Sequence, residues 1–146
     1  MTEKELTATT ERPRRHIVWL NVAFLTLTPL AAAIAVPWYV LTHGVSWVEI
    51  GACVLMLLIT GLSITAGYHR LFAHRAYAAP APVRALFAII GAAAFENSVI
   101  SWAAAHRFHH RHVDTDDDPY NAQEGFFYSH VGWIMIEGPK HDDTSN

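Results

Sequence analysis

Two apolar stretches dominate the sequence: IVWLNVAFLTLTPLAAAIAVPWYVL at residues 17–41 and IGACVLMLLITGLSITAGY at residues 50–68. No Asp, Glu, Lys or Arg occurs from residue 17 to 48 or from 50 to 68. An uncharged apolar run of about 18 residues or more is typical of a transmembrane helix, because about 20 residues at about 1.5 Å each cross the hydrocarbon core. The two runs therefore predict a two-span transmembrane hairpin in an all-α, integral membrane helical protein.

Polar segments divide the rest of the 146-residue chain. We expect residues 1–16 to be a disordered polar tail, 17–68 the hairpin, 69–136 a cytoplasmic or interfacial region, and 137–146 a second polar tail. Arginines precede the first apolar run and follow the second, whereas the connection between the runs has no Lys or Arg. The positive-inside rule then predicts that the N-terminus and the region after the hairpin are cytoplasmic.

A cleaved signal peptide is the alternative interpretation of the first run, because basic residues precede it and LAAAIA at residues 30–35 resembles a cleavage region. Two later apolar segments, 85–95 and 125–136, are too short to cross a bilayer. We expect the helix near the first of them to continue through Glu96, Asn97 and Trp102. The formal net charge of -3 and the lack of an extended basic patch indicate that nucleic acid is not a partner.

Histidines are concentrated in HRFHHRH at residues 106–112. Neutral imidazole is the commonest metal ligand, so this pattern favours a metal site. On a helix, His106 can share an ion with His109 or His110, which lie three and four residues on. His109 and His110 themselves diverge and would serve two ions, or an ion and its surroundings, which hints at a dinuclear centre. The alternative is a solvated basic helix end that favourably faces the helix dipole.

A second pair, His69 and His74, stands in GYHRLFAHR directly after the second apolar run. Five residues on an α-helix span about 140° of rotation, so the two rings would enter a shared core from its sides rather than lie on one stripe. Arg70 and Arg75 also fit a plain membrane-interface anchor. The acidic run from Asp114 to Asp118 predicts a loop, which could supply a carboxylate that orients a ligand histidine.

Four motifs together carry a resemblance to a known family: GYHRLFAHR, HRFHHRH, DPYN at residues 118–121 and GFFYSHVGW at residues 125–133. In this order they resemble the membrane fatty acid desaturases, in particular the acyl-CoA delta-9 (stearoyl-CoA) type. The resemblance covers roughly residues 47–136. It implies that His69, His74, His106, His109 and His110 are metal ligands, whereas His112 lies outside the matched pattern and His130 is expected to be a packing residue.

The resemblance implies a centre of two iron ions that uses O2 as co-substrate to introduce a cis double bond into a fatty acyl chain. The substrate would be a fatty acyl thioester or a lipid in the membrane. Electrons would come from an external donor, cytochrome b5-like or ferredoxin-like, because the sequence has no dinucleotide-binding fingerprint. Removing hydrogen from unactivated carbon needs a redox-active metal, which argues against zinc.

The family has a third histidine box and further spans after the GFFYSHVGW region, which this sequence does not contain. We therefore expect the chain to be the N-terminal portion of a longer enzyme or a truncated product, inactive alone. Ala103, Ala104 and Ala105 stand where acyl-CoA members tend to carry charged residues, which leaves CoA, acyl-carrier protein and lipid open as carriers. A membrane di-iron hydroxylase or alkane monooxygenase, and a non-enzymatic metal-binding hairpin, are the alternative functions.

Overall fold

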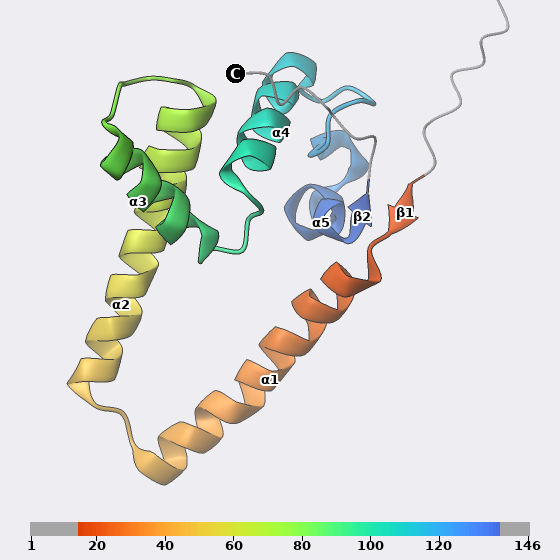
Figure 1. Ribbon diagram of the computed structural model, residues 1–146. Coiled ribbons are helices and arrows are strands. Elements are labelled where there is room, and N and C mark those ends of the chain that lie inside the picture. Colours follow the sequence, from red (N-terminus) through yellow and green to blue (C-terminus); the bar gives the residue numbers. More distant parts are fainter. Residues whose placement is uncertain (1–14, 138–146) are drawn as a thin grey trace, which may run out of the picture.

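The computed structural model describes residues 15–137. Its largest feature is a hairpin of two long helices, α1 (Trp19–His43) and α2 (Trp47–Leu62), which are joined at one end and diverge toward the other (Figure 1). Ser46 begins α2 with a capping box: its hydroxyl accepts the amide of Glu49, and the Glu49 carboxylate accepts the amide of Ser46. A short turn with a strong helix start thus joins the two apolar runs as the arms of an open hairpin.

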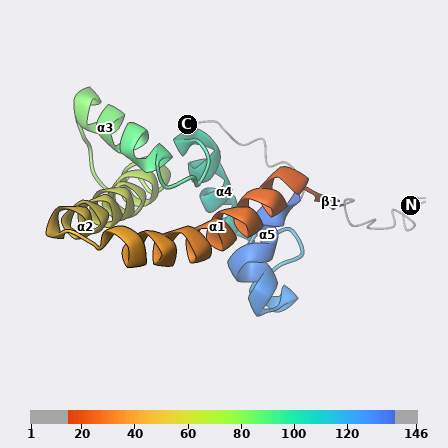
Figure 2. The same ribbon diagram turned by 90° about the horizontal axis from the view of Figure 1, so that it is seen from below.

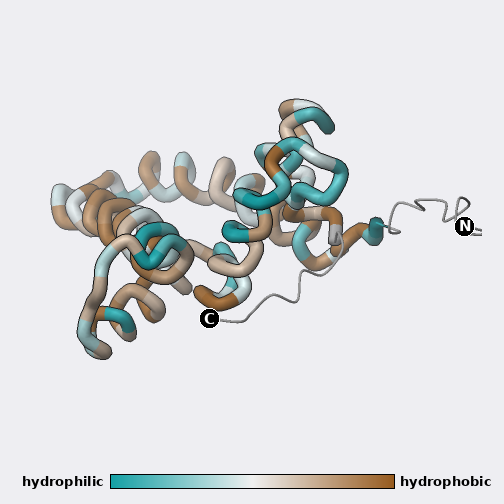
Figure 3. Tube along the Cα trace, turned by 90° about the horizontal axis from the view of Figure 1, so that it is seen from above, coloured by the Kyte–Doolittle hydropathy of each residue, from teal (hydrophilic) through white to brown (hydrophobic). Residues whose placement is uncertain are grey.

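Both arms of the hairpin are long and apolar enough to cross a membrane. The first comprises the 25 residues of α1, and the second is one continuous helix of 27 residues, Trp47–Ala73. No residue of α1 is buried, and Leu20 and Leu41 are 79% and 85% exposed. Hydrophobic residues line both arms, whereas hydrophilic residues gather near α4 and the loop after it (Figure 3). The predicted all-α fold with two spanning helices is confirmed.

The second arm ends in a wide helical segment, the π-helix η1 (Ser63–Ala73). Hydrogen bonds in a π-helix run between residues five apart, so each turn holds more residues than the 3.6 of an α-helix. The amide of His74 donates to the carbonyl of His69 at 2.9 Å, which places these two histidines one hydrogen-bonded turn apart. The estimate of about 140° between them is therefore wrong, because this backbone is not α-helical.

Two shorter helices follow, α3 (Ala81–Ala92) and α4 (Val99–His112). Phe95 and Asn97, in the connection between them, have positive φ angles of +59° and +72°. This left-handed conformation cannot continue a right-handed helix. The hydroxyl of Ser98 then caps α4 by accepting an amide of its first turn. The prediction of one helix running through residues 96–102 is consequently wrong.

Glycines allow α3 to pack closely against η1. A Cβ on Gly91 would lie 2.4 Å from Cε1 of Tyr68, and a Cβ on Gly67 would lie 2.8 Å from Cβ of Phe87. Tyr68 is only 1% exposed and donates its hydroxyl to the carbonyl of Ala88 at 3.3 Å. Among residues 15–137 the buried apolar side chains gather here and along α4, so this contact fixes the end of the second arm.

The last described segments are short: η2 (Ala122–Glu124), the π-helical turn η3 (Tyr128–Gly132), α5 (Trp133–Met135) and the strand β2 (Ile136–Glu137). The strand β2 pairs antiparallel with β1 (His16–Ile17). Viewed from below, α3 and α5 flank the hairpin from opposite sides (Figure 2). The pairing of β1 with β2 thus brings the two ends of the described range, 15–137, side by side.

Four further contacts hold the start of α1 and the residues before it to the segment after α4. The amide of Val18 donates to the carbonyl of Met135 at 2.8 Å, and the side-chain amide of Asn21 donates to the carbonyl of Ile134 at 2.7 Å. Arg15 forms an ion pair with Glu124 and lies over the ring of Tyr128 at 5.0 Å. Arg15 and His16 fall within the predicted N-terminal tail, whereas residues 1–14 and 138–146 of the predicted tails lie outside the described residues.

Candidate metal centre

Four of the five histidines predicted as metal ligands converge at the end of the second arm. His69 and His74 come from η1 and its C-terminal cap, and His106 and His110 lie one turn apart on α4. The Nε2 atom of His74 is 3.1 Å from that of His69 and 3.1 Å from that of His106, and the Nε2 atom of His110 is 3.1 Å from that of His106. One ligand atom from each residue lies within 4.8 Å of all the others.

These nitrogen separations fit a single shared ion. A transition metal at about 2.1 Å from each imidazole nitrogen holds neighbouring nitrogens about 3.0 Å apart at octahedral angles and about 3.4 Å apart at tetrahedral angles. The observed 3.1 Å lies inside this range for all three neighbouring pairs. The donor set consists of imidazoles alone, which suits iron, copper, nickel or zinc and does not suit calcium or magnesium. The residues therefore fit a transition-metal site.

The electrostatics of the cluster favour the neutral imidazole that a metal requires. Burial lowers the pKa of His106 to about 4, and the neighbouring His110, His69, His74 and His109 add to the effect. Burial also lowers the pKa of His74, with smaller contributions from two of the same histidines. Protons consequently compete weakly with a metal ion for these nitrogens.

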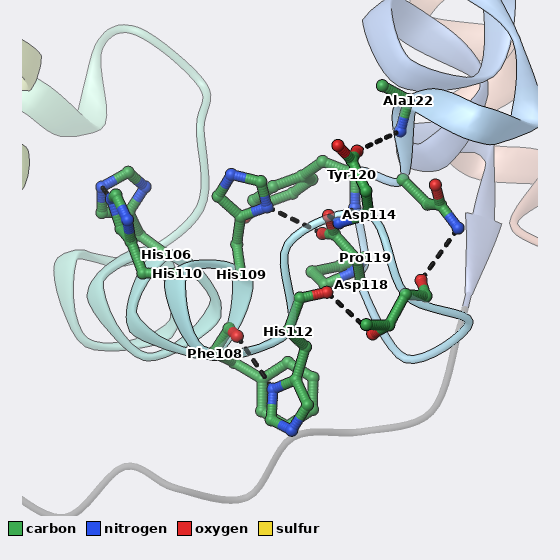
Figure 4. A network of polar contacts seen from close by, with 12 residues as sticks. His106, Phe108, His109, His110, His112, Asp114, Asp118, Pro119, Tyr120 and Ala122 are labelled. Atoms are coloured by element: carbon green, nitrogen blue, oxygen red, sulfur yellow. Dashed lines mark hydrogen bonds and ion pairs between the residues drawn. The ribbon is translucent and has the colours of Figure 1, made fainter.

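His109 points away from this group, as its position beside His110 predicts (Figure 4). Its Nδ1 atom lies 2.7 Å from Oδ1 of Asp118, whose side chain is fully buried. Burial alone would raise the pKa of Asp118, but hydrogen bonds from His109 and from the amides of Tyr120 and Asp114 hold it below the usual value. The charged carboxylate keeps the proton of His109 on Nδ1, so the lone pair of Nε2 is free to bind a metal.

The other two histidines of this region take packing roles. His112 stacks on Phe108 with ring centroids 4.0 Å apart, and its Nδ1 lies 3.0 Å from the Phe108 carbonyl (Figure 4). His130 stacks on Phe126 with ring centroids 4.0 Å apart, and its Nδ1 lies 2.8 Å from the Phe126 carbonyl. Neither belongs to the converging group, which agrees with the sequence interpretation.

A cavity of about 770 Å³ borders the histidine cluster. His106 and Trp102 of α4 form part of its wall, and Tyr120 and Trp133, which follow α4 in the sequence, also line it. The indole of Trp102 stacks on His106 with ring centroids 4.8 Å apart and donates to the carboxylate of Glu96, which also lines the cavity. Asn97 lines the same cavity.

Sequence reasoning missed the aromatic residues that support the histidines. Trp102 precedes His106 by four residues, and that helical spacing alone could have indicated that the rings share a face. Tyr120 lies against His109 with ring centroids 5.1 Å apart, and burial followed by the charges of Asp118 and Glu96 raises its pKa to about 12. Only the loop geometry brings Tyr120 to that place, and no sequence spacing signals it.

The fold and this site define a class of protein: a helical membrane protein with a transition-metal site of histidines at one end of its hairpin. The chain is 39% identical to an acyl-CoA desaturase of Cyprinus carpio over 133 residues, which are 91% of this chain and 39% of the relative. It is 43% identical to a probable acyl-CoA desaturase of Schizosaccharomyces pombe over 90% of this chain and 27% of the relative. Stearoyl-CoA desaturase 5 of Homo sapiens is 38% identical over 92% of this chain and 41% of the relative.

By this similarity the chain belongs to the membrane fatty acid desaturases of the acyl-CoA delta-9 type. It spans about two fifths of the length of the first of these relatives. No protein-family model matches the chain.

Proposed function

We propose that this chain provides the first part of the metal centre of a fatty acyl desaturase, an oxidoreductase that introduces a cis double bond into an acyl chain. The observation that carries the proposal is the convergence of four imidazoles beside a cavity lined by aromatic side chains. The relatives, which are named acyl-CoA and stearoyl-CoA desaturases, support a fatty acyl thioester as the substrate. A lipid-linked acyl chain is the other carrier consistent with the uncharged Ala103–Ala105.

His69, His74, His106 and His110 would hold one iron ion. His109, oriented by Asp118, would offer its Nε2 to a second ion whose remaining ligands come from outside the described residues. Iron supplies the one-electron steps by which O2 can be activated and hydrogen removed from unactivated carbon. The protein contributes by fixing the imidazoles in neutral form and by excluding water: the stacked Trp102 and the aromatic cavity wall hold an apolar chain beside His106.

The histidine cluster would face the cytoplasm, together with the N-terminus. The distribution of arginine supports this orientation, since the hairpin turn carries no Lys or Arg. An external electron donor, cytochrome b5-like or ferredoxin-like, would then reach the centre from the same side. The bilayer would deliver the acyl substrate, which partitions into the hydrocarbon region around the exposed arms of the hairpin.

Two measurements test this function. The full-length protein, expressed in membranes with a suitable electron donor, should convert saturated acyl chains to cis-monounsaturated ones, as read by gas chromatography and mass spectrometry. The same preparation should contain iron, and His106→Ala should remove both the product and the iron. A hydroxylated product instead of an alkene would show a hydroxylase. A metal-free protein that still forms the alkene would contradict the assignment of the histidines.

A further inference from the structure

The loop between α4 and η2 holds Asp118 by hydrogen bonds to both its side chain and its main chain. The carboxylate accepts the amides of Asp114 and Tyr120, each at 2.9 Å, in addition to its contact with His109 (Figure 4). The amide of Asp118 donates to the carbonyl of Thr115 at 3.1 Å. The position of this carboxylate is therefore set by the conformation of the loop.

Asn121 closes the loop with a buried side chain, and the whole residue is 3% exposed. Its Nδ2 atom donates to the carbonyl of Thr115 at 2.8 Å, which is the same carbonyl that accepts the amide of Asp118. Its Oδ1 atom accepts the amide of Gln123 at 2.8 Å. The amide of Asn121 also donates to the carbonyl of Asp118 at 3.3 Å. The main chain of Asp118 is consequently tied to Asn121 both directly and through Thr115.

The loop has a conformation that needs this support. Asp114 has a positive φ of +57°, in a left-handed region that is uncommon for residues other than glycine. Pro119 cannot donate a main-chain hydrogen bond, because it has no amide hydrogen. Burial of a polar side chain is favourable only where its donors and acceptors find partners, and Asn121 finds them across the loop. Asn121 thus stabilises the segment that carries Asp118.

The position of Asp118 decides which nitrogen of His109 carries the proton. A neutral imidazole has one N–H group and one lone pair, and an ionised carboxylate can only accept. The Nδ1 atom of His109, 2.7 Å from Oδ1 of Asp118, is therefore the donor. If the carboxylate moved away, the proton could transfer to Nε2, which would then have no lone pair for a metal ion.

We propose that Asn121 is a positioning residue for His109: by fixing Asp118, it keeps the Nε2 atom of His109 available as a metal ligand. The ion concerned is the second iron ion of the proposed function, on which the metal role of this assignment rests. Asn121 forms its hydrogen bonds with Thr115, Asp118 and Gln123 and acts on His109 through the loop.

Nuclear magnetic resonance of the metal-free chain in detergent tests this role. Long-range correlation of proton and nitrogen signals in the histidine-labelled chain, at about pH 8, identifies the protonated nitrogen of each neutral ring, and His109→Gln identifies the His109 signal. We expect the Nδ1–H form for His109 in the unmodified chain. Asn121→Asp keeps an acceptor for the amide of Gln123 but loses the donor to Thr115. It should raise the ratio of the Nε2–H to the Nδ1–H form of His109 by about two- to tenfold, the range for loss of one hydrogen bond.

Two controls accompany this comparison. Gln123→Glu introduces the same charge two positions further on, in an exposed residue, and should leave the tautomer of His109 unchanged. His112 reports on folding, because its Nδ1 atom lies 3.0 Å from the carbonyl of Phe108 and must donate to it. The Nδ1–H form of His112 should persist in every folded variant.

An Nε2–H form of His109 in the unmodified chain overturns the proposal. An unchanged tautomer in Asn121→Asp, with the His112 signal intact, also overturns it. Asn121→Ala removes the donor without adding a charge, and it decides the question if Asn121→Asp does not fold. The spectra are recorded without metal, so they do not depend on whether the full-length protein binds a second iron ion. A failure of the proposed function would therefore leave the effect of Asn121 on His109 standing, and the reverse also holds.

Discussion

Alanine substitutions at His109 and His110 distinguish the roles of two adjacent histidines in metal binding. The structure places the imidazole of His110 within the group of four histidines, whereas the imidazole of His109 turns to Asp118. We therefore expect His110→Ala to abolish tight binding of the first metal ion to the chain. We expect His109→Ala to leave that first binding step nearly unchanged, although His109 lies on the same turn of α4.

The size of the effect follows from the number of ligands. Four-ligand zinc sites in peptides bind with about 10–16 kcal/mol, so one ligand of four accounts for about 2.5–4 kcal/mol. That corresponds to a loss of about 10²–10³-fold in affinity for His110→Ala. His109 contributes no atom to the group of four and acts on it only through a weak charge effect. Its replacement should change the first binding constant by less than about threefold.

A cobalt titration of the purified chain, followed by the visible absorption of the bound ion, measures these constants directly. His112→Ala is the matched control, because His112 stacks on Phe108 and belongs to neither arrangement. The reasoning is refuted if His109→Ala weakens the first equivalent as much as His110→Ala does. It is also refuted if His110→Ala binds the first cobalt as tightly as the unmodified chain.

Three further predictions concern the surroundings of the centre. Asp118→Asn should lower the metal occupancy that depends on His109, with an affinity loss of about 10–100-fold, measured as the iron content of the full-length protein. The metal-free chain should lose stability as the pH falls from 6.5 toward about 4, because the unfolded state takes up a proton at His106 before the folded state does. Thermal unfolding at several pH values should show this decrease in stability. His106→Gln should make the decrease smaller. Gly91→Ala should destabilise the fold by about 1–3 kcal/mol through overpacking, whereas Gly61→Ala, with open space around it, should not; denaturation in detergent compares the two.

The sequence predicted those features that depend on composition and short-range spacing. Long uncharged runs cannot be mistaken for soluble strands or loops, so the two arms of the hairpin followed from them directly. The helical repeat allowed His106 to share an ion with either His109 or His110, and the structure brings His110 to it. The divergence of His109 from His110 followed from the same geometry, since adjacent residues on a helix point in different directions.

Other features depend on backbone conformations that cannot be predicted from the types of single residues. The π-helical register that brings His69 and His74 together replaces hydrogen bonds between residues four apart by bonds between residues five apart, and no residue type in SITAGYHRLFA demands it. The break before α4 depends on left-handed conformations at Phe95 and Asn97, of which only asparagine favours that state. The ion pair of Arg15 with Glu124 joins residues 109 positions apart, and no local sequence pattern can predict such a contact.

That ion pair constrains the order in which the chain can fold during its synthesis. A ribosome adding about 5–20 residues each second needs on the order of 5–20 s to pass from Arg15 to its partner. The start of α1 must therefore wait for a segment that is synthesised more than a hundred residues later. Residues 69–110, which carry the four imidazoles, are synthesised during this interval, before Arg15 can pair with Glu124.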